Sequence, residues 1–339
     1  GGCCGTTPAH IAALRAELGA LPQQTEAAPA AKLSTGTAPA VEKDDTFLRK
    51  LNAGEKVIAI ELDSPRVADL SGYLDGARRL QAAGADLLTI ADCPIAQARM
   101  DSSLVACRVH QELGMCALPH MTCRDRNRIA LQSDLLSAAM LGIDNILCLT
   151  GDHTKLGDHP QAKPVFDLDS VSLLHAASLL ETGKDLGGNE LVGEPPKFAK
   201  GAVVSPCSDS IDAQLVKMER KVQAGAEFFQ TQAVFEPEKF IKFMEAAKQF
   251  GKPVQVGIII PKSAGMCKFM NNNVAGVHIP DELIAELQAD KEKTKAGITG
   301  VEIAARIIRE CKPYCQGVHI MSLGWESKVP ALLEQAGLK

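Results

Sequence analysis

Several short apolar runs of the sequence carry or precede polar side chains that could take part in chemistry. Glu61 ends the first run, His120 lies in another, Asp152 follows a third and Gln232 follows a fourth. Carboxylates, an imidazole and an amide suit proton transfer and the orientation of a heterocycle more than covalent hydrolysis. After residue 45 no Cys/His pair has zinc spacing, and the chain has no Walker-type phosphate loop and no serine in a nucleophile elbow. We therefore expect no metal site.

The elements that must position these groups follow a regular order after residue 46. Short runs rich in β-branched residues alternate with longer segments of helical period. The predicted strands are residues 57–62, 87–90, 116–121, 145–149, 201–204, 228–231, 254–259 and 317–320. The predicted helices are residues 69–83, 102–112, 126–141, 170–181, 211–224, 237–249 and 300–311. Strands alternating with helices in this number indicate an α/β fold of the (β/α)8, or TIM barrel, type.

The structural alternative is a doubly wound open sheet. Such a sheet usually carries a glycine-rich turn after its first strand, whereas residues 62–65 here read Leu-Asp-Ser-Pro. In a barrel, catalytic groups come from the C-terminal ends of the strands, and the polar positions named above lie at or just after such ends. The pattern therefore predicts one site at that end of the barrel.

Composition excludes several classes of protein. Of 339 residues, 46% are hydrophobic and 23% charged, an ordinary globular mix. A net charge of −5 and 4% aromatic residues argue against binding to nucleic acid or to an anionic membrane, and the apolar runs are too short to span a bilayer. Eleven scattered cysteines favour a reducing cytoplasm over a secreted disulfide scaffold. The Cys311-x3-Cys315 spacing alone gives little support to a redox or metal role.

The first 45 residues differ from the rest. Residues 24–45 are rich in Ala, Pro, Thr and charge, lack hydrophobic periodicity and read as a linker. Residues 8–21 have helical spacing, but a lone helix of this length is not a domain. We expect residues 1–23 to be the last part of an upstream domain, and residues 46–339 to form the barrel.

Five segments carry a resemblance to a known family. They read IELDSP (60–65), LPHMTCRD (118–125), GIDNILCLTGD (142–152), RKVQAGA (220–226) and QTQ (230–232). In this order they resemble the flavin-dependent methylenetetrahydrofolate reductases, over residues 46–337. The resemblance implies reduction of 5,10-methylenetetrahydrofolate to 5-methyltetrahydrofolate by hydride from reduced FAD, in one-carbon metabolism and methionine biosynthesis, with NAD(P)H as the reductant.

The N-terminal segment carries a second resemblance. GGCCGTTP (1–8) is similar to the closing motif of homocysteine S-methyltransferase barrels, where two adjacent cysteines bind zinc with a third from earlier in that domain. The chain therefore resembles the reductase half of a bifunctional methyltransferase/reductase, with the tail of the methyltransferase domain at its start. Because the third cysteine is absent, we expect no functional zinc here.

The first resemblance implies roles for individual residues. Glu61 matches the acid that protonates the folate, and burial beside a flavin is expected to raise the pKa of such a carboxyl. Asp152 matches an anion near the flavin and pterin that tunes hydride transfer, and Gln232 matches an amide that orients the pterin or nicotinamide. The resemblance implies FAD contacts from Asp152 and from Thr89, His120, Leu149, Thr150, Gly151, Phe166, Asp167 and Lys221.

The chain also departs from the family pattern. Thr150 stands where well-known members have Arg, and Trp325 stands where an Arg helps to bind folate. Two other functions stay open: a flavin-free pterin-binding methyltransferase barrel, and a reductase subunit that works only with a partner electron donor. The sequence also leaves open whether NADH or NADPH is used, and whether the chain forms a homo-oligomer.

Overall fold

Eight parallel strands close into a barrel in the part of the chain that the structure, a computed structural model, describes: residues 8–20, 46–274 and 276–339. The strands are β1 (Val57–Glu61), β2 (Leu87–Ile90), β3 (Cys116–Thr122), β4 (Asn145–Leu149), β5 (Ala199–Val204), β6 (Phe228–Ala233), β7 (Val254–Ile259) and β8 (Gly317–Met321). They pair in sequence order, and β8 pairs back with β1. The predicted (β/α)8 barrel and its strands are confirmed.

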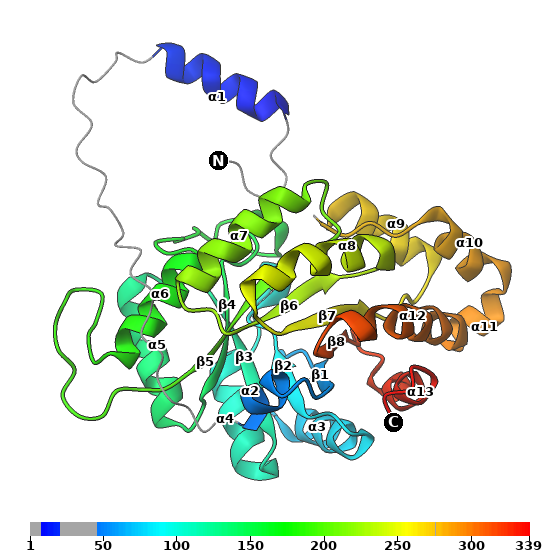
Figure 1. Ribbon diagram of the computed structural model, residues 1–339, viewed down its shortest axis with the longest axis horizontal. Coiled ribbons are helices and arrows are strands. Elements are labelled where there is room, and N and C mark those ends of the chain that lie inside the picture. Colours follow the sequence, from blue (N-terminus) through cyan, green and yellow to red (C-terminus); the bar gives the residue numbers. More distant parts are fainter. Residues whose placement is uncertain (1–7, 21–45, 275) are drawn as a thin grey trace.

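Helices surround this barrel (Figure 1). Those that follow single strands are α3 (Ser71–Ala83), α4 (Ser102–Leu113), α5 (Arg128–Met140), α6 (Ser170–Glu181), α7 (Ile211–Gln223), α8 (Pro237–Ala247) and α13 (Val329–Gln335). Between β7 and β8 the chain forms α9 (Ala264–Asn273), α10 (Asp281–Ala289), α11 (Lys291–Lys295) and α12 (Ile298–Cys311). The sequence predicted only α12 of this last group. No helix in the described ranges has the length and apolar character needed to cross a membrane.

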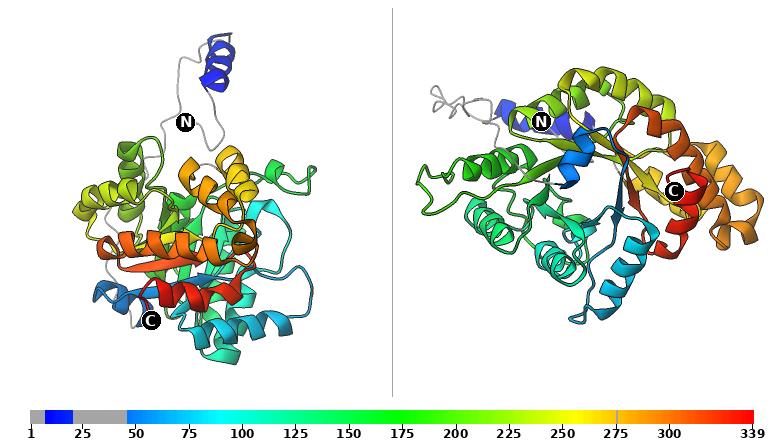
Figure 2. Two further views of the ribbon diagram at one scale, coloured as in Figure 1. Left: turned by 90° about the vertical axis from the view of Figure 1, so that its right-hand side faces the viewer. Right: turned by 60° about the horizontal axis from the view of Figure 1, so that its bottom comes forward.

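The N-terminal segment contains one described helix. The helix predicted over residues 8–21 is present as α1 (Pro8–Ala20), and Figure 1 and the left-hand view of Figure 2 show it apart from the barrel. The predicted linker, residues 24–45, and the paired cysteines of the first eight residues lie outside the described residues.

A short helix that the sequence analysis missed closes the N-terminal end of the barrel. This helix, α2 (Thr46–Asn52), lies inside the ring of outer helices in the right-hand view of Figure 2. Its Phe47 is 4% exposed and packs edge-on against Phe228, with ring centroids 5.0 Å apart. Leu118 and Leu147 from the barrel interior belong to the same buried cluster. This end of the barrel is therefore a packed apolar core.

The barrel interior changes from apolar to polar along the strands. Side chains two residues apart on a strand share a face, so Ala59 and Glu61 of β1 point the same way, as do Leu118 and His120 of β3. The first of each pair is apolar and lies in the core next to α2. The second is polar and lies nearer the C-terminal end. This alternation concentrates buried polar groups beneath the predicted site.

Two buried amides on β6 and β7 form one such polar pair. Gln230 Nε2 donates to Gln255 Oε1 over 3.1 Å, and both residues are at most 1% exposed. The remaining Oε1 of Gln230 and Nε2 of Gln255 have no hydrogen-bond partner within the described residues. We expect Gln255→Leu to lower the free energy of unfolding by about 2 kcal/mol, because it leaves the whole Gln230 amide unpaired.

The matched variant for this prediction is the double substitution. Gln230→Leu with Gln255→Leu should cost less than the sum of the two single changes, since it removes both partners together. Urea denaturation of the four proteins measures this difference. Additive losses would show that the two amides do not stabilise each other.

Candidate active site

Glu61 lies among polar side chains from three other strands at the C-terminal end of the barrel. Its Oε2 is 3.4 Å from Nε2 of His319 on β8 and 3.9 Å from Nε2 of His120 on β3. Thr89 Oγ1 on β2 lies 3.0 Å from the same nitrogen of His319. All four residues are largely buried, with 13% of the Glu61 side chain exposed. We call these four residues the Glu61 cluster.

The cluster sets the charge of its members. Burial raises the pKa of Glu61, but the hydrogen bond and charge of His319, together with the charge of His120, lower it further, so the pKa lies below the ordinary value. Burial lowers the pKa of His120 to about 4, and the nearby carboxylate offsets this only in part. The resting pair is therefore a glutamate carboxylate beside a neutral His120.

The lowered pKa of Glu61 differs from the expectation for a buried acid. A raised pKa follows when desolvation is the dominant effect, as the sequence argument assumed for Glu61. In the structure two imidazoles surround the carboxylate and favour its charged form. Proton donation by Glu61 therefore requires a change in these surroundings when ligands bind.

Gln232 lies at an irregular end of β6. The register between β6 and β7 shifts between Gln230 and Ala233, which marks a β-bulge. The Thr231 hydroxyl accepts a hydrogen bond from the Gly257 amide over 2.8 Å, and Gln232 Oε1 accepts one from the Ala233 amide over 3.1 Å. A Cβ on Gly257 would lie 2.2 Å from the Thr231 carbonyl oxygen. The bulge that places Gln232 therefore depends on glycine at position 257.

The end of β4 holds three of the residues assigned to FAD contacts. Leu149 is half-buried and pairs with Thr122 on the adjacent strand β3. The Thr150 hydroxyl accepts a hydrogen bond from the Ser170 amide at the start of α6, so this side chain supports the next helix. Gly151 has a φ of +91°, and a Cβ there would lie 3.0 Å from Cβ of Thr122. The tight turn after β4 thus requires glycine.

Asp152 is exposed on the rim, beyond the Glu61 cluster. Its Oδ2 accepts a hydrogen bond from the Ile95 amide over 3.1 Å. Ile95 and Ala96 both have φ near +50°, an uncommon backbone conformation for residues with side chains. Asp152 therefore stabilises a strained loop that follows β2.

Two further predicted contacts come from the loop before α6. Phe166 is half-buried, has a φ of +42° and lies 6.1 Å from the ring of His153. Asp167 forms a two-point ion pair with Arg128 and accepts from its backbone amide over 2.9 Å. These bonds lower the pKa of Asp167 to about 2. Asp167 is therefore an anion held at the start of α5.

Lys221 on α7 turns its side chain toward the barrel. Its Nζ donates to the Val203 carbonyl oxygen over 2.5 Å, close to the end of β5. Burial lowers the pKa of Lys221 to about 8. A half-buried cation bonded to one backbone carbonyl keeps donor capacity for a further anionic group.

The structure brings together part of the predicted set. Glu61, Thr89 and His120 form one cluster, and within the described residues no hydrogen bond or ion pair joins that cluster to Asp152 or Gln232. All of these residues lie at or beyond the C-terminal ends of strands. They therefore face the same end of the barrel.

The sequence analysis missed two features of this site. His319 lies two residues after Gly317, on the inward face of a strand that was itself predicted, so strand periodicity contained the signal. Lys262 Nζ, after β7, lies 5.4 Å from the centre of the Trp325 ring, after β8, and donates to the Leu323 carbonyl. This cation–π pair adds an aromatic surface and a positive charge to the rim.

Across residues 8–20, 46–274 and 276–339, no three His, Cys, Asp or Glu side chains are grouped to hold a metal ion. Cys311 and Cys315 are buried, burial raises the pKa of both thiols, and the Cys315 thiol donates to backbone carbonyls. These two cysteines are packed core residues.

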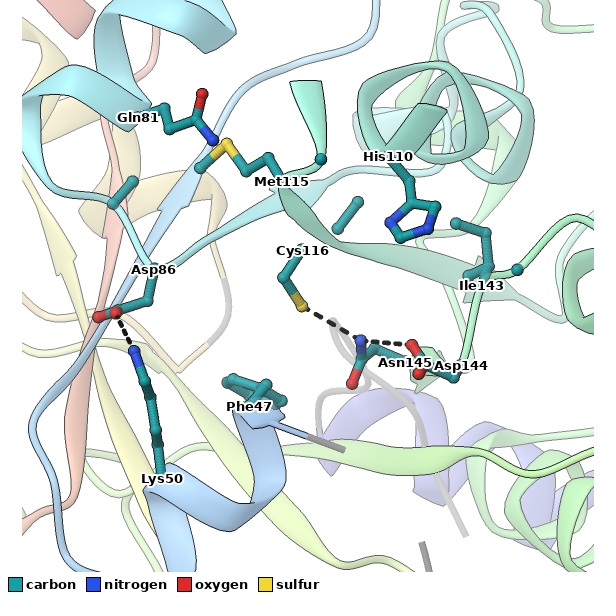
Figure 3. Close-up of a pocket in the computed structure, with 14 residues that line it drawn as sticks. Phe47, Lys50, Gln81, Asp86, His110, Met115, Cys116, Ile143, Asp144 and Asn145 are labelled. Atoms are coloured by element: carbon teal, nitrogen blue, oxygen red, sulfur yellow. Dashed lines mark hydrogen bonds and ion pairs between the residues drawn. The ribbon is translucent and has the colours of Figure 1, made fainter. Parts of the chain in front are cut away.

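A separate cavity of about 380 Å³ opens at the opposite end of the barrel, where β2, β3 and β4 begin (Figure 3). Its polar groups bond mainly to each other. Lys50 pairs with Asp86 over 2.9 Å, and Asn145 Nδ2 donates to Cys116 Sγ and to Asp144 Oδ1. None of the predicted site residues lines this cavity. The candidate site is therefore the polar C-terminal end.

Comparison with known proteins identifies similar sequences. A family model described as "Methylenetetrahydrofolate reductase" matches residues 46–337. "Methylenetetrahydrofolate reductase 2" of Schizosaccharomyces pombe is 27% identical over 243 residues, covering 68% of this chain and 36% of that protein. "Probable methylenetetrahydrofolate reductase (NADPH)" of Caenorhabditis elegans is 23% identical over 304 residues, covering 86% and 43%. The chain thus spans less than half the length of these two relatives.

A solved structure shares the fold. It is described as "Uncharacterized protein from Clostridium thermocellum binds two copies of 5-methyl-5,6,7,8-tetrahydrofolic acid". The TM-score is 0.58 with 14% sequence identity, and the match covers 86% of this chain and 97% of the other. At this identity the likeness shows a common barrel.

Proposed function

The chain belongs to the methylenetetrahydrofolate reductase family, and on that premise we propose that it reduces 5,10-methylenetetrahydrofolate to 5-methyltetrahydrofolate. One observation of the site carries the proposal. A largely buried carboxyl, Glu61, lies at the C-terminal end of the barrel with its Oε2 3.4 Å from Nε2 of His319. Opening the imidazolidine ring of the substrate requires a proton donor, and Glu61 is placed to be one.

The residues present fit FAD. His120 Nε2 is buried and lacks a hydrogen-bond partner within the described residues, so it can bond to a flavin heteroatom. The half-buried Lys221 ammonium suits a diphosphate. Thr89, Leu149, Thr150, Gly151, Asp152, Phe166 and Asp167 are the further proposed contacts, although Thr150 and Asp167 already bond within the protein. When bound, FAD supplies the hydride.

The chain's own side chains have three proposed roles. Glu61 delivers a proton to a ring nitrogen of the folate. Asp152 places a negative charge on the rim, where its field acts on the flavin and pterin and tunes hydride transfer. Gln232, positioned by the β6 bulge, offers an amide that orients the pterin or the nicotinamide. NAD(P)H or a partner subunit is the proposed reductant.

Anaerobic stopped-flow experiments on the full chain test this function. The protein should bind FAD, be reduced by NADH or NADPH, and then be reoxidised by methylenetetrahydrofolate. Reduction by dithionite alone, followed by reoxidation with the folate, would identify a subunit that needs a protein electron donor. A chain that stays colourless after incubation with FAD would overturn the proposal and favour a flavin-free pterin methyltransferase.

Lys221 gives a pH-dependent prediction. We expect Lys221→Met to weaken FAD binding roughly tenfold or more at pH 7, because a charge-assisted bond to the diphosphate is lost. In the wild type the Kd should rise as the pH rises through about 8, where the ammonium of the free protein loses its proton. Fluorescence titration with FAD at several pH values measures both effects.

The matched control for Lys221 is on the same helix. Lys217 is exposed, and Lys217→Met should leave FAD affinity within about twofold of the wild type, as expected for a solvated charge. Equal weakening by both substitutions would point to net charge rather than to a site at Lys221.

The domain assignment is also a proposal. Residues 46–339 would be the reductase barrel, residues 24–45 a linker, and residues 1–23 the tail of a homocysteine S-methyltransferase domain. Its support is the GGCCGTTP segment and the helix α1 beside it.

A further inference from the structure

We propose that the loop between β2 and α4 contains a strap, residues 93–97, that positions the Asp152 carboxylate, and that Gly157 seats this strap. This inference deepens the proposed function and rests on it, because it gives the anion assigned to the flavin and pterin a fixed place on the rim. The strap lies beyond the end of β2, at Ile90, and before the start of α4, at Ser102.

The backbone of the strap is strained. Cys93, Ile95 and Ala96 have φ of +46°, +53° and +49°. They are three of the five residues other than glycine with a positive φ in the part of the chain that the structure describes. A β-branched residue such as isoleucine rarely adopts this conformation, which persists only where surrounding contacts hold it. The strap therefore depends on its contacts with other loops.

Polar contacts, rather than burial of Ile95, fasten the strap. Ile95 is 54% exposed, and its amide donates to Asp152 Oδ2 over 3.1 Å. The Gln97 side chain accepts a hydrogen bond from the guanidinium of Arg66, which follows β1. Arg66 also lies 3.8 Å from Asp158 in the loop after β4. The strap is therefore tied to the loops that follow β1 and β4.

Gly157 brings the loop after β4 against the strap. A Cβ at this position would lie 2.1 Å from the Ala96 carbonyl oxygen and 2.8 Å from the carbonyl carbon, and both atoms are backbone. The φ of Gly157 is −91°, which any residue can adopt, so glycine is required here for the close contact rather than for its conformation. The loop after β4 thus holds the strap at two points, Gly157 and Asp152.

The bond to the strap restricts the Asp152 side chain. An exposed aspartate without a partner moves among several rotamers, whereas a carboxylate oxygen bonded to a fixed amide stays in one place. Asp152 Oδ1 has no hydrogen bond or ion pair among the described residues, so that oxygen remains for an N–H group of the pterin. The strap therefore acts through Asp152, by fixing where its negative charge lies.

An exchange measurement on the full chain tests the contact and needs neither FAD nor folate. In chain labelled with ¹⁵N at isoleucine, the Ile95 amide signal is the one missing from the Ile95→Val variant. We expect this amide to exchange with solvent at least about tenfold faster in Asp152→Ala and in Gly157→Ala than in the wild type, because its acceptor is removed or displaced. Equal exchange in all three proteins would overturn the proposal.

A further variant avoids any clash. Gly157 lies in a rim loop rather than between strands, so its added methyl group should displace the strap at little cost to the fold. Arg66→Met adds no such contact, removes the bonds of Arg66 to Gln97 and Asp158, and should make Ile95 exchange roughly threefold faster. If Gly157→Ala does not fold, Arg66→Met decides, and exchange at the wild-type rate would refute the strap.

Kinetics test the effect on the proposed reaction. Gly157→Ala should slow reoxidation of the flavin by methylenetetrahydrofolate roughly tenfold, because the charge of Asp152 is displaced. In the Asp152→Ala background the same substitution should have no further effect, because Gly157 acts through Asp152. Additive losses would contradict the proposal, since they would indicate general damage to the rim.

Gly72→Ala is the matched control. Gly72 lies in the first turn of α3, where a Cβ would meet nothing within 4 Å, so this variant should keep both the exchange of Ile95 and the rate of reoxidation. Melting temperature and FAD content show whether each variant is folded. A wild-type chain that binds no FAD would refute the proposed function, whereas a working wild type with unaltered exchange and kinetics in Gly157→Ala would refute this inference alone.

Discussion

Glu61→Gln should slow folate reduction at least about 100-fold, the size of general acid catalysis, while leaving reduction of the flavin intact. The amide keeps the size of the carboxyl and its place beside His319, but it has no acidic proton to give to the folate. General acid catalysis contributes about 10²- to 10⁴-fold, so we expect a loss of that size in the folate half-reaction. Stopped-flow absorbance at the flavin band separates the two half-reactions.

The matched control lies before the same strand. Glu55 is exposed and precedes β1 at the opposite end of the barrel, so Glu55→Gln should not change either half-reaction. If Glu61→Gln lost both half-reactions equally, Glu61 would be a structural or flavin-binding group rather than the proton donor.

Among substitutions that add one methyl group at the site, Gly257→Ala should destabilise the protein most. The added Cβ would lie 2.2 Å from the Thr231 carbonyl oxygen and 3.0 Å from that of Gln232, and both contacts are with backbone. The strands must move apart or the bulge must shift, which should cost about 3 kcal/mol of unfolding free energy. Because the bulge positions Gln232, we also expect weaker folate binding. Urea denaturation and folate titration measure the two effects.

At a second glycine, the same substitution to alanine should raise rather than lower the free energy of unfolding. Gly72 lies in the first turn of α3, and a Cβ there would meet nothing within 4 Å. Gly72→Ala should therefore stabilise the protein by about 0.5 kcal/mol, because alanine restricts the unfolded chain. Wild-type stability in Gly257→Ala would show that β6 and β7 can separate freely at this point.

The two site predictions are independent in their physical cause. Glu61→Gln replaces a carboxylate with an amide of nearly the same shape, whereas Gly257→Ala changes shape without removing a polar group. The first should therefore affect the rate of folate reduction most strongly, and the second should affect stability most strongly. Measuring both quantities on both variants separates the chemistry of the site from its support.

Local patterns in the sequence determined the barrel and the end at which its site lies. Strand alternation is a property of residues two apart, so the runs that became β1 and β3 already showed where Glu61 and His120 would lie. Helical period is equally local, and α6 was predicted with its observed bounds. The helices α9, α10 and α11 were missed because they are short and lie in one long connection between β7 and β8.

Only the tertiary structure decided the electrostatics of the site and the closure of the N-terminal end of the barrel. Thr89 and His319 are 230 residues apart in the chain, and they touch because β8 returns to pair with β1. Charge interactions depend on distance in space, so the sequence could not show that imidazoles, rather than burial alone, set the pKa of Glu61. The bulge in β6 depends on its contacts with β7, and the closure of the barrel by α2 depends on contacts with side chains inside the barrel. Only folding brings these residues together.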